Sequence, residues 1–253
     1  MSPSRTTPEC ALVTGAGRRI GRAIALDLGR RGWRVAVHYG TSRSEAEAVV
    51  AEIREHGGTA ESFPADLADA VDVGSLIDEV MRRLGSVTCL VNNASLFLDD
   101  RIATLNVTDW DRQLDINLRA PVLLAQHFAR ALPADRSGHI INIIDQRVLR
   151  PTPEYFSYAV SKSALWTATR MLAQALAPRI RVNGVGPGPV LRSIHQSEAD
   201  FATEAGSTLL GHGTTPEEIA AAVLFLLDQS AITGQMIAID GGQHLLWRVP
   251  GSS

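Results

Sequence analysis

The chain is short of cysteine, of net charge and of long apolar runs, and each shortage excludes a class of protein. Only Cys10 and Cys89 occur among 253 residues, and neither has a second cysteine or a histidine at the spacing of metal ligands. Both lie in apolar, strand-like runs, so we interpret them as reduced core residues. A net charge of −3 and a pI near 6.2 provide no electrostatic footprint for nucleic acid or for an anionic membrane surface. The expected partner is a small molecule.

Segments that would enter a membrane are also missing from the sequence. Its first eight residues contain no apolar signal core, and no apolar run approaches the length of a bilayer span. We therefore expect a cytoplasmic location. The histidines His195, His212 and His244 have no acids or cysteines in a ligand arrangement, so no metal is predicted.

The chain does contain a regular alternation of short apolar runs and helical patterns. With 45% hydrophobic and 20% charged residues, it can build a large core. The alternation predicts an α/β fold, a Rossmann-type doubly wound parallel sheet of about seven strands with helices on both faces, in a single domain over residues 1–253. The expected strands are 10–14, 33–38, 59–65, 87–92, 138–144, 180–185 and 235–239, and the expected helices are 20–31, 44–56, 71–84, 109–132, 154–177 and 215–228.

One connection is too long for this pattern. Residues 187–214 open with Pro-Gly-Pro, contain further glycines, and follow the end of a predicted strand. Ligands bind beyond the carboxyl ends of strands in such sheets, and a connection this long is typically a lid or a binding segment. We therefore expect a substrate lid at about 187–214.

A glycine-rich loop joins the first predicted strand to the first predicted helix. Its glycines permit tight turns, and the free N–H groups and dipole of a helix N-terminus attract a pyrophosphate. The strand–loop–helix context makes this a strong dinucleotide-binding signal, whereas a glycine cluster alone would be weak. The loop residues assigned to the cofactor are Gly15, Arg18, Arg19, Ile20 and Gly21.

The end of the second predicted strand indicates which dinucleotide binds. The segment from His38 and Tyr39 to Arg43 contains no Asp or Glu to accept hydrogen bonds from the ribose hydroxyls of NAD. Arg18, Ser42 and Arg43 offer groups for a 2′-phosphate, which predicts NADPH. The alternative is that the arginines are solvated surface charges.

Two further strand ends are assigned to the cofactor site. Asp66, followed by Leu67, either hydrogen-bonds the adenine edge or caps the next helix. Asn93 and Ala94, after the fourth predicted strand, either wall the cofactor or only satisfy a turn. The sequence leaves both alternatives open.

Three residues predict the chemistry. Tyr158 and Lys162 are four positions apart, so on a helix they share a face, and the ammonium favours ionisation of the phenol. Asp145 lies thirteen residues before Tyr158, where most proteins with a Tyr-x-x-x-Lys reductase site have serine. Its carboxylate would have the opposite effect and raise the pKa of the phenol. The proton would then stay on the phenol until a substrate takes it, which favours reduction over oxidation. The alternative for Asp145 is a structural acid that caps a turn.

Taken together, these motifs resemble the short-chain dehydrogenase/reductase family over about 11–247. The resemblance implies that Lys162 holds the nicotinamide ribose and that Asn117 kinks or hydrates its helix and extends a proton relay through Lys162. It also implies a homotetramer with the 109–132 and 154–177 helices at one interface and the C-terminal strand and tail at another. The further cofactor contacts that it implies are Asn93, Ala94, Tyr158, Lys162, Pro187, Gly188 and Val190.

Two departures from the general pattern of that family match one branch. Arg19 stands where the pattern has glycine and Asp145 where it has serine, and both substitutions are similar to those of the pteridine reductases and the bacterial dihydromonapterin/dihydrofolate reductases. The resemblance implies that Phe97 stacks on a pterin opposite the nicotinamide and that Ser95 hydrogen-bonds the ring. The implied substrate set is Arg18, Ser95, Phe97, Asp145 and Tyr158.

The implied reaction is NADPH-dependent reduction of a pterin, dihydropterin or dihydrofolate-type C=N bond, with Tyr158 as the proton donor. The nearest alternative is an NADPH-dependent reductase of a ketone or 3-oxoacyl thioester, which needs neither Phe97 nor Asp145. A non-catalytic dinucleotide-binding sensor is a third possibility, against which the intact Tyr158–Lys162 pair argues.

Three arginines near the site have no assigned role in this reaction. Arg192 replaces a threonine common in the family. We interpret Arg147 and Arg150 as solvated charges, the alternative being attraction of an anionic tail such as a folate glutamate.

Overall fold

One seven-stranded parallel sheet organises the part of the chain that the computed structural model describes, residues 9–192 and 196–247. Its strand order is β3-β2-β1-β4-β5-β6-β7, and every neighbouring pair is parallel. The strands are β1 (Cys10–Val13), β2 (Arg34–Tyr39), β3 (Thr59–Pro64), β4 (Cys89–Asn92), β5 (Gly138–Ile143), β6 (Ile180–Pro187) and β7 (Met236–Ile239). The predicted α/β class and Rossmann-type sheet are confirmed.

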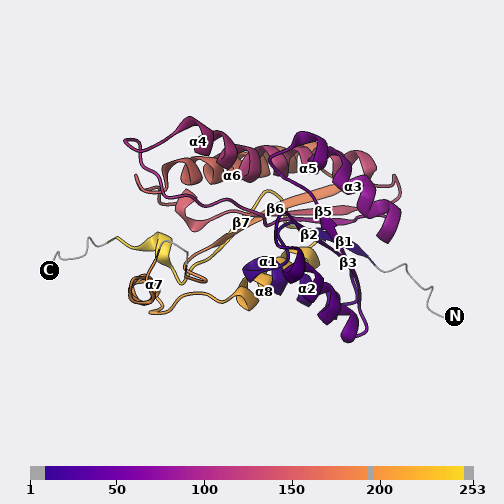
Figure 1. Cartoon of the computed structure of the whole chain (residues 1–253), viewed down its shortest axis with the longest axis horizontal. Helices are drawn as coiled ribbons and strands as arrows, with labels where there is room; N and C mark the ends of the chain where they lie inside the picture. The colour runs from indigo at the N-terminus through magenta and orange to yellow at the C-terminus, as the bar shows by residue number, and fades with distance from the viewer. Residues whose placement is uncertain (1–8, 193–195, 248–253) are drawn as a thin grey trace.

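Helices cover both faces of the sheet because its strands are apolar on both sides. Successive residues of β1 belong to different clusters: Ala11 and Val13 pack on one face, Cys10 and Leu12 on the other. Figure 1 shows the two helical layers with the sheet between them. One layer contains α1 (Arg19–Arg30), α2 (Arg43–Glu55) and α8 (Pro216–Asp228); the other contains α3 (Ala70–Leu84), α4 (Val107–Leu114), α5 (Ala120–Ala131) and α6 (Phe156–Leu176).

Both cysteines lie in this core, as predicted from their apolar surroundings. Cys10 and Cys89 are free thiols with no exposed surface. Burial raises the pKa of the Cys10 thiol to about 11 and also raises the pKa of Cys89, because a thiolate is poorly solvated there. Neither thiol is therefore placed for nucleophilic chemistry.

The strand order places a crevice between β1 and β4. The chain runs outward from β1 through β2 to β3 and then crosses back to β4, on the other side of β1. The connections that leave β1 and β4 therefore diverge beyond their carboxyl ends, where ligands bind in doubly wound sheets. The glycine loop after β1 and the Asn93 loop after β4 meet at this point, since Asn93 Nδ2 donates to Gly15 O at 3.2 Å.

The helix expected over 109–132 spans 107–131 in the structure, with a break in its α-helical hydrogen bonding in the middle. Between α4 and α5 the chain forms a π-helical turn, η1 (Asp115–Arg119). Pro121 lies in the first turn of α5 and has no N–H to donate to the carbonyl of Asn117, four residues earlier. A proline inside an otherwise helical pattern was the signal for this break.

Two other boundaries differ from expectation. The helix expected from 154 begins at Phe156, because Tyr155 adopts a left-handed conformation with φ 51° and ψ 51° that does not continue a right-handed helix. The predicted lid contains a helix that hydrophobic periodicity did not indicate, α7 (Glu198–Gly206). Its N-terminus is a capping box of Ser197 and Asp200, a pair that is readable in the sequence. The role of 187–214 as a lid stays a prediction.

The expectations for location and assembly concern the outer surface. No helix among the described residues is long and apolar enough to cross a membrane. On α6, Leu165 is buried in the core, whereas 63% of Met171 is exposed. Core packing therefore accounts for Leu165 but not for Met171, and the implied homotetramer stays a prediction.

Candidate active site

The glycine loop is held by a buried histidine. Gly15, with φ +62°, donates its backbone N–H to His38 Nδ1 at 3.0 Å, and His38 Nε2 lies 3.1 Å from Ala65 O. The imidazole therefore carries its proton on Nε2 and accepts at Nδ1. Burial lowers the pKa of His38 to about 4, so the ring is neutral near pH 7. His38 and the buried Tyr39 lie behind the loop rather than on the cavity surface expected for cofactor contacts.

Asn93 and Gly21 shape the opposite side of the loop. Asn93 Nδ2 donates to Thr14 O at 2.9 Å and Gly15 O at 3.2 Å, while Thr14 Oγ1 accepts from the N–H groups of Asn93 and Ala94. A Cβ at Gly21 would overlap the Gly15 carbonyl oxygen and the Asn93 amide. Asn93 thus holds the loop and lines the cavity, and its expected contact with the cofactor stays a prediction.

Arg19 connects the glycine loop to the segment after β6. Its φ of 54° costs a residue with a side chain about 1–2 kcal/mol, which explains why the general family pattern has glycine here. The guanidinium donates to the carbonyls of Leu191 and Arg192, each at 2.9 Å. These two bonds offset the strain and place the start of the predicted lid over the loop.

The expected 2′-phosphate residues lie at the surface around the start of α2. Arg18 forms a 3.3 Å ion pair with Glu45, and Arg43 pairs with Glu47 at 2.7 Å. Ser42 is the N-cap residue of α2. Arg18 lines the main cavity, whereas Ser42 and Arg43 lie outside its lining.

Asp66 does not cap the next helix, which corrects one of the two sequence alternatives. The capping residue of α3 is Asp69, whose Oδ1 accepts from Val71 N at 2.7 Å. Asp66 Oδ1 instead accepts from Ala68 N at 2.9 Å in an Asx turn, and Leu67 is buried. The proposed adenine contact of Asp66 stays a prediction.

Tyr158 and Asp145 are brought together from α6 and the end of β5. Tyr158 donates its hydroxyl to Asp145 Oδ2 at 2.9 Å, and Asp145 Oδ1 accepts from Arg147 N at 2.7 Å. Asp145 therefore does cap a turn, η2 (Gln146–Val148), and also faces the phenol. Burial, followed by the charge and hydrogen bond of Asp145, raises the pKa of Tyr158 well above its usual value. Burial also raises the pKa of Asp145, so the pair retains a proton.

Lys162 influences the phenol less than its spacing suggested. Lys162 Nζ lies 5.6 Å from the centre of the Tyr158 ring and donates to Ile143 O at 2.8 Å. Burial lowers the pKa of Lys162 to about 8. The expectation that the ammonium makes the phenol easy to ionise is not met here, because burial and the nearby carboxylate outweigh the ammonium.

Asn117 holds the loop after β4 instead of reaching Lys162 with its side chain. Its Oδ1 accepts from Leu96 N at 2.8 Å and from Ser95 Oγ at 3.1 Å, and its Nδ2 donates to Leu96 O and Ser161 Oγ. These bonds use the whole amide. The expected kink or hydration of the helix and the relay through Lys162 stay predictions.

An aromatic wall follows this loop. Phe97 stacks on Tyr155 with ring centres 4.5 Å apart and an interplanar angle of 25°, and meets the Tyr158 ring edge-on at 4.7 Å. Tyr155 was missed by the sequence analysis, because nothing in the local pattern indicates its left-handed backbone. Both rings line the cavity beside the Tyr158 ring and form its aromatic wall.

Most of the predicted site residues line one cavity. Its volume is about 550 Å³, within the usual range for small-molecule sites. The cavity extends from the glycine loop to Glu204 and Phe201 of α7, neither of which the sequence analysis identified. The predicted residues that line it are Gly15, Arg18, Arg19, Ile20, Gly21, Asn93, Ala94, Ser95, Phe97, Asp145, Tyr158, Lys162, Pro187, Gly188 and Val190. Asn117, His38, Tyr39, Ser42, Arg43, Asp66 and Leu67 are not part of the lining.

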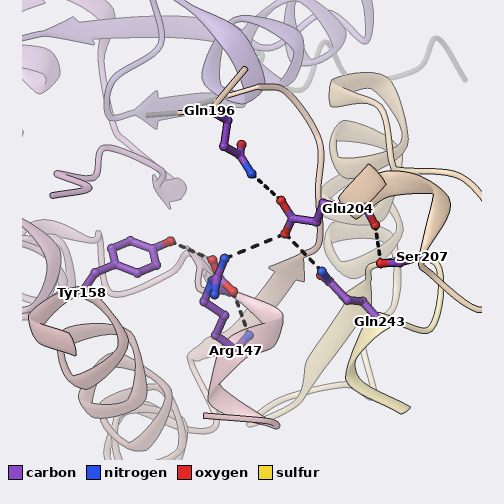
Figure 2. Close-up of polar contacts among 7 residues, drawn as sticks. Arg147, Tyr158, Gln196, Glu204, Ser207 and Gln243 are labelled. Atoms are coloured by element: carbon purple, nitrogen blue, oxygen red, sulfur yellow. Dashed lines mark hydrogen bonds and ion pairs between the residues drawn. The ribbon is translucent and has the colours of Figure 1, made fainter. Parts of the chain in front are cut away.

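Glu204 connects α7 to the segment that precedes it and to the short helix after β7. Its carboxylate accepts from Gln196 Nε2 at 2.6 Å and from Gln243 Nε2, in η3 (Gln243–Leu245), at 3.2 Å. Arg147 approaches the same carboxylate at 3.9 Å (Figure 2). The interpretation of Arg147 as a solvated charge is wrong, because only 19% of its side chain is exposed, whereas Arg150 is at the surface. Predicted residue His195 lies outside the described residues.

The polar groups that the structure describes form no cluster of three or more His, Cys, Asp or Glu side chains able to hold a metal ion. A hydroxyl, a carboxylate and an ammonium at the carboxyl ends of β5 and β6 are suited instead to holding and moving a proton.

Comparisons with known proteins agree on the family and differ on the substrate. A family model described as Enoyl-(Acyl carrier protein) reductase matches residues 15–244. A 3-oxoacyl-[acyl-carrier-protein] reductase FabG from Staphylococcus aureus is 36% identical over 242 residues, covering 94% of this chain and 98% of the relative.

Similar solved structures contain NADP. The FolM alternative dihydrofolate reductase 1 from Brucella canis, complexed with NADP, is 46% identical, with a TM-score of 0.93 and 97% of each chain covered. A short chain dehydrogenase from Burkholderia cenocepacia, in complex with NADP, is 35% identical, with a TM-score of 0.88 over 95% of this chain and 99% of that one.

Proposed function

The chain belongs to the short-chain dehydrogenase/reductase family and is an NADP-dependent oxidoreductase, and from this premise we propose that it reduces the C=N bond of a pterin, dihydropterin or dihydrofolate-type substrate. The observation that carries the proposal is the 2.9 Å hydrogen bond from the Tyr158 hydroxyl to Asp145. A carboxylate at this point supports delivery of a proton, which reduction of a C=N bond requires at nitrogen.

The residues present fit the cofactor. The N-terminus of α1 has no side-chain cap, so its N–H groups are available to a pyrophosphate. A Cβ at Gly21 would overlap Gly15 O and the Asn93 amide, so glycine at this position lets the loop pack closely against the helix. Bound NADPH supplies the hydride. Lys162 and Asn93 are placed on the cavity wall to hold the nicotinamide end.

Proton delivery is assigned to Tyr158. Its raised pKa keeps the phenol protonated across the neutral range, and Asp145 orients the hydroxyl. After Tyr158 gives its proton to the substrate nitrogen, the phenolate needs a new proton. Protonated Asp145, a form that burial favours, is the nearest source of that proton. Ile143 O holds the Lys162 ammonium beside this pair.

The substrate ring is assigned to the wall formed by Phe97. Its flat face is suited to stacking on a heterocycle, and Ser95 Oγ retains acceptor capacity while it donates to Asn117. The FolM neighbours, 46% identical, are named as dihydrofolate reductases, which favours the same substrate class here.

A second candidate is reduction of a ketone or a 3-oxoacyl thioester. It is favoured by the FabG relatives, which are 36% identical over 94% of this chain. The same Tyr158 and Lys162 would serve it. That reaction does not need the Phe97 wall or Asp145, where the general family pattern has serine, and for that reason we place it second.

A substrate panel separates the two candidates. NADPH oxidation would be measured with dihydrobiopterin, dihydromonapterin, dihydrofolate, a quinonoid dihydropterin, a simple ketone and a 3-oxoacyl thioester. We expect the highest kcat/KM for one of the pterin-type substrates. Turnover of the thioester or the ketone alone would replace the proposal by the second candidate.

The cofactor preference gives a further prediction. NADPH is expected to bind at least about tenfold more tightly than NADH, because Arg18 and Arg43 can form charge-assisted hydrogen bonds with a 2′-phosphate. The double replacement Arg18→Gln and Arg43→Gln should remove most of this difference by weakening NADPH alone. Fluorescence titration measures both affinities, with Arg82→Gln, an exposed ion-paired arginine on α3, as the control. Equal affinities in the unmodified protein would contradict the prediction.

A further inference from the structure

The cavity contains a guanidinium that has no hydrogen-bond acceptor. Among the described residues, the side chain of Arg147 makes no hydrogen bond, and its nearest carboxylate oxygen, Oε1 of Glu204, is 3.9 Å from Nη2. Only 19% of the side chain is exposed, so water satisfies its five N–H donors less fully than at a surface arginine. Enclosed hydrogen-bond donors normally have an acceptor, so the enclosure of Arg147 indicates that a bound ligand supplies one.

Glu204 forms only a long ion pair with Arg147, because its nearest oxygen is 3.9 Å away, beyond hydrogen-bond distance. Gln196 Nε2 donates to Oε2 at 2.6 Å and Gln243 Nε2 donates to Oε1 at 3.2 Å. Figure 2 shows Glu204 reached by both amides, with the Arg147 guanidinium on the side that faces Tyr158. The other nearby carboxylate, Asp145, accepts from Tyr158 and from the Arg147 backbone N–H, and neither carboxylate accepts a hydrogen bond from the Arg147 guanidinium.

The direction of the Arg147 side chain is fixed from two sides. The hydrogen bond from its N–H to Asp145 Oδ1, at 2.7 Å, sets the turn from which the side chain leaves. The guanidinium then lies over the Tyr155 ring, 5.1 Å from its centre. The strained backbone of Tyr155 holds that ring between Arg147 and Phe97. The same aromatic wall thus extends from the proton donor to the guanidinium.

We propose that Arg147 binds a carboxylate that the substrate carries on a substituent of its reducible ring. The inference deepens the proposed function and depends on it: with the ring on the Phe97 wall beside Tyr158, the substituent extends toward Arg147. A carboxylate matches the planar fork of a guanidinium with two parallel hydrogen bonds, whereas a neutral polyol side chain offers no such pair of charged acceptors. The substrate class is therefore a pterin that bears a carboxylate, of the dihydrofolate type.

The test compares two substrates that share the reducible ring. The ratio of kcat/KM for dihydrofolate to that for dihydrobiopterin would be measured in the unmodified protein and in Arg147→Gln, Arg147→Lys and Arg150→Gln. We expect Arg147→Gln to lower the ratio about 10- to 100-fold, mainly through the KM for dihydrofolate, because charge-assisted hydrogen bonds to the carboxylate are lost. Arg147→Lys keeps the charge without the planar fork and should give an intermediate ratio.

Arg150→Gln is the matched control, since it removes an exposed arginine from the same segment and should leave the ratio as it is. NADPH affinity confirms folding of each variant. If Arg147→Gln slows both substrates equally, or neither, the carboxylate assignment is overturned while the pterin reductase proposal stands. If the unmodified protein reduces no pterin at all, the proposed function fails and this inference fails with it.

Discussion

Replacing Tyr158 with phenylalanine is expected to lower kcat for pterin reduction by about 10²- to 10⁴-fold, the range for loss of a general acid. Its hydroxyl donates to Asp145 at 2.9 Å and lies on the cavity surface beside the Phe97 ring. Burial raises the pKa of the phenol well above its usual value, and Asp145 raises it further, so Tyr158 holds its proton at neutral pH. Steady-state NADPH oxidation measures the loss.

Affinity for NADPH serves as the control for this variant. Phenylalanine keeps the ring that packs edge-on against Phe97, so the fold and the NADPH dissociation constant should change little. A solvent deuterium isotope effect on kcat should be present in the unmodified protein and lost in Tyr158→Phe. Turnover within a few fold of the unmodified protein would show that another group, or water, supplies the proton.

Replacing Asp145 with serine is expected to lower kcat for the pterin substrate by about 10- to 100-fold, at the low end of the general acid–base range. Serine restores the residue that the general family pattern has at this position. The pKa of Tyr158 should fall, because the charge and hydrogen bond of Asp145, which raise it, are removed. The reaction should slow because the carboxyl group that holds and replaces the Tyr158 proton is gone. NADPH binding should persist, since the glycine loop and the N-terminus of α1 do not contact Asp145.

The pH profile separates this role from a purely structural one. Burial raises the pKa of Asp145, so the carboxylate takes up a proton at a higher pH than an exposed aspartate does. In the unmodified protein kcat for pterin reduction should therefore rise as the pH falls through the pKa of Asp145. In Asp145→Ser that rise should be absent. A variant that is slower but keeps the same pH dependence would assign Asp145 to capping η2 alone.

Much of the fold followed from local patterns that need no tertiary information. Residues such as Leu12 and Val91 belong to strands that are apolar on both sides, and this alone predicts a parallel sheet covered on both faces. The failures came where a local pattern was overridden. A π-helical turn just before Pro121 replaced part of a long α-helical period, and Tyr155 delayed the start of α6 by adopting a left-handed conformation.

The candidate site divides in a similar way. Residues whose chemistry depends on a short spacing, such as Tyr158 with Lys162 and the glycines after β1, were identified from the sequence and line the cavity. Roles assigned only from a position at or after the end of a strand were less reliable. His38 lies behind the glycine loop, and Asp69, rather than Asp66, caps α3. Side-chain direction at a strand end depends on the next turn, which the strand pattern does not specify.

The sequence by itself determined the sheet, the dinucleotide loop and the pairing of a phenol with a lysine, because these depend on periodicity and on spacings within a helix or a loop. Only the tertiary structure decided which charges act on the phenol and which side chains close the cavity. Burial is a property of the whole fold, so the raised pKa of Tyr158 and the enclosure of Arg147 could not be read locally. Arg147 and Glu204 are 57 residues apart in the chain and meet only because α7 folds back over the end of β5.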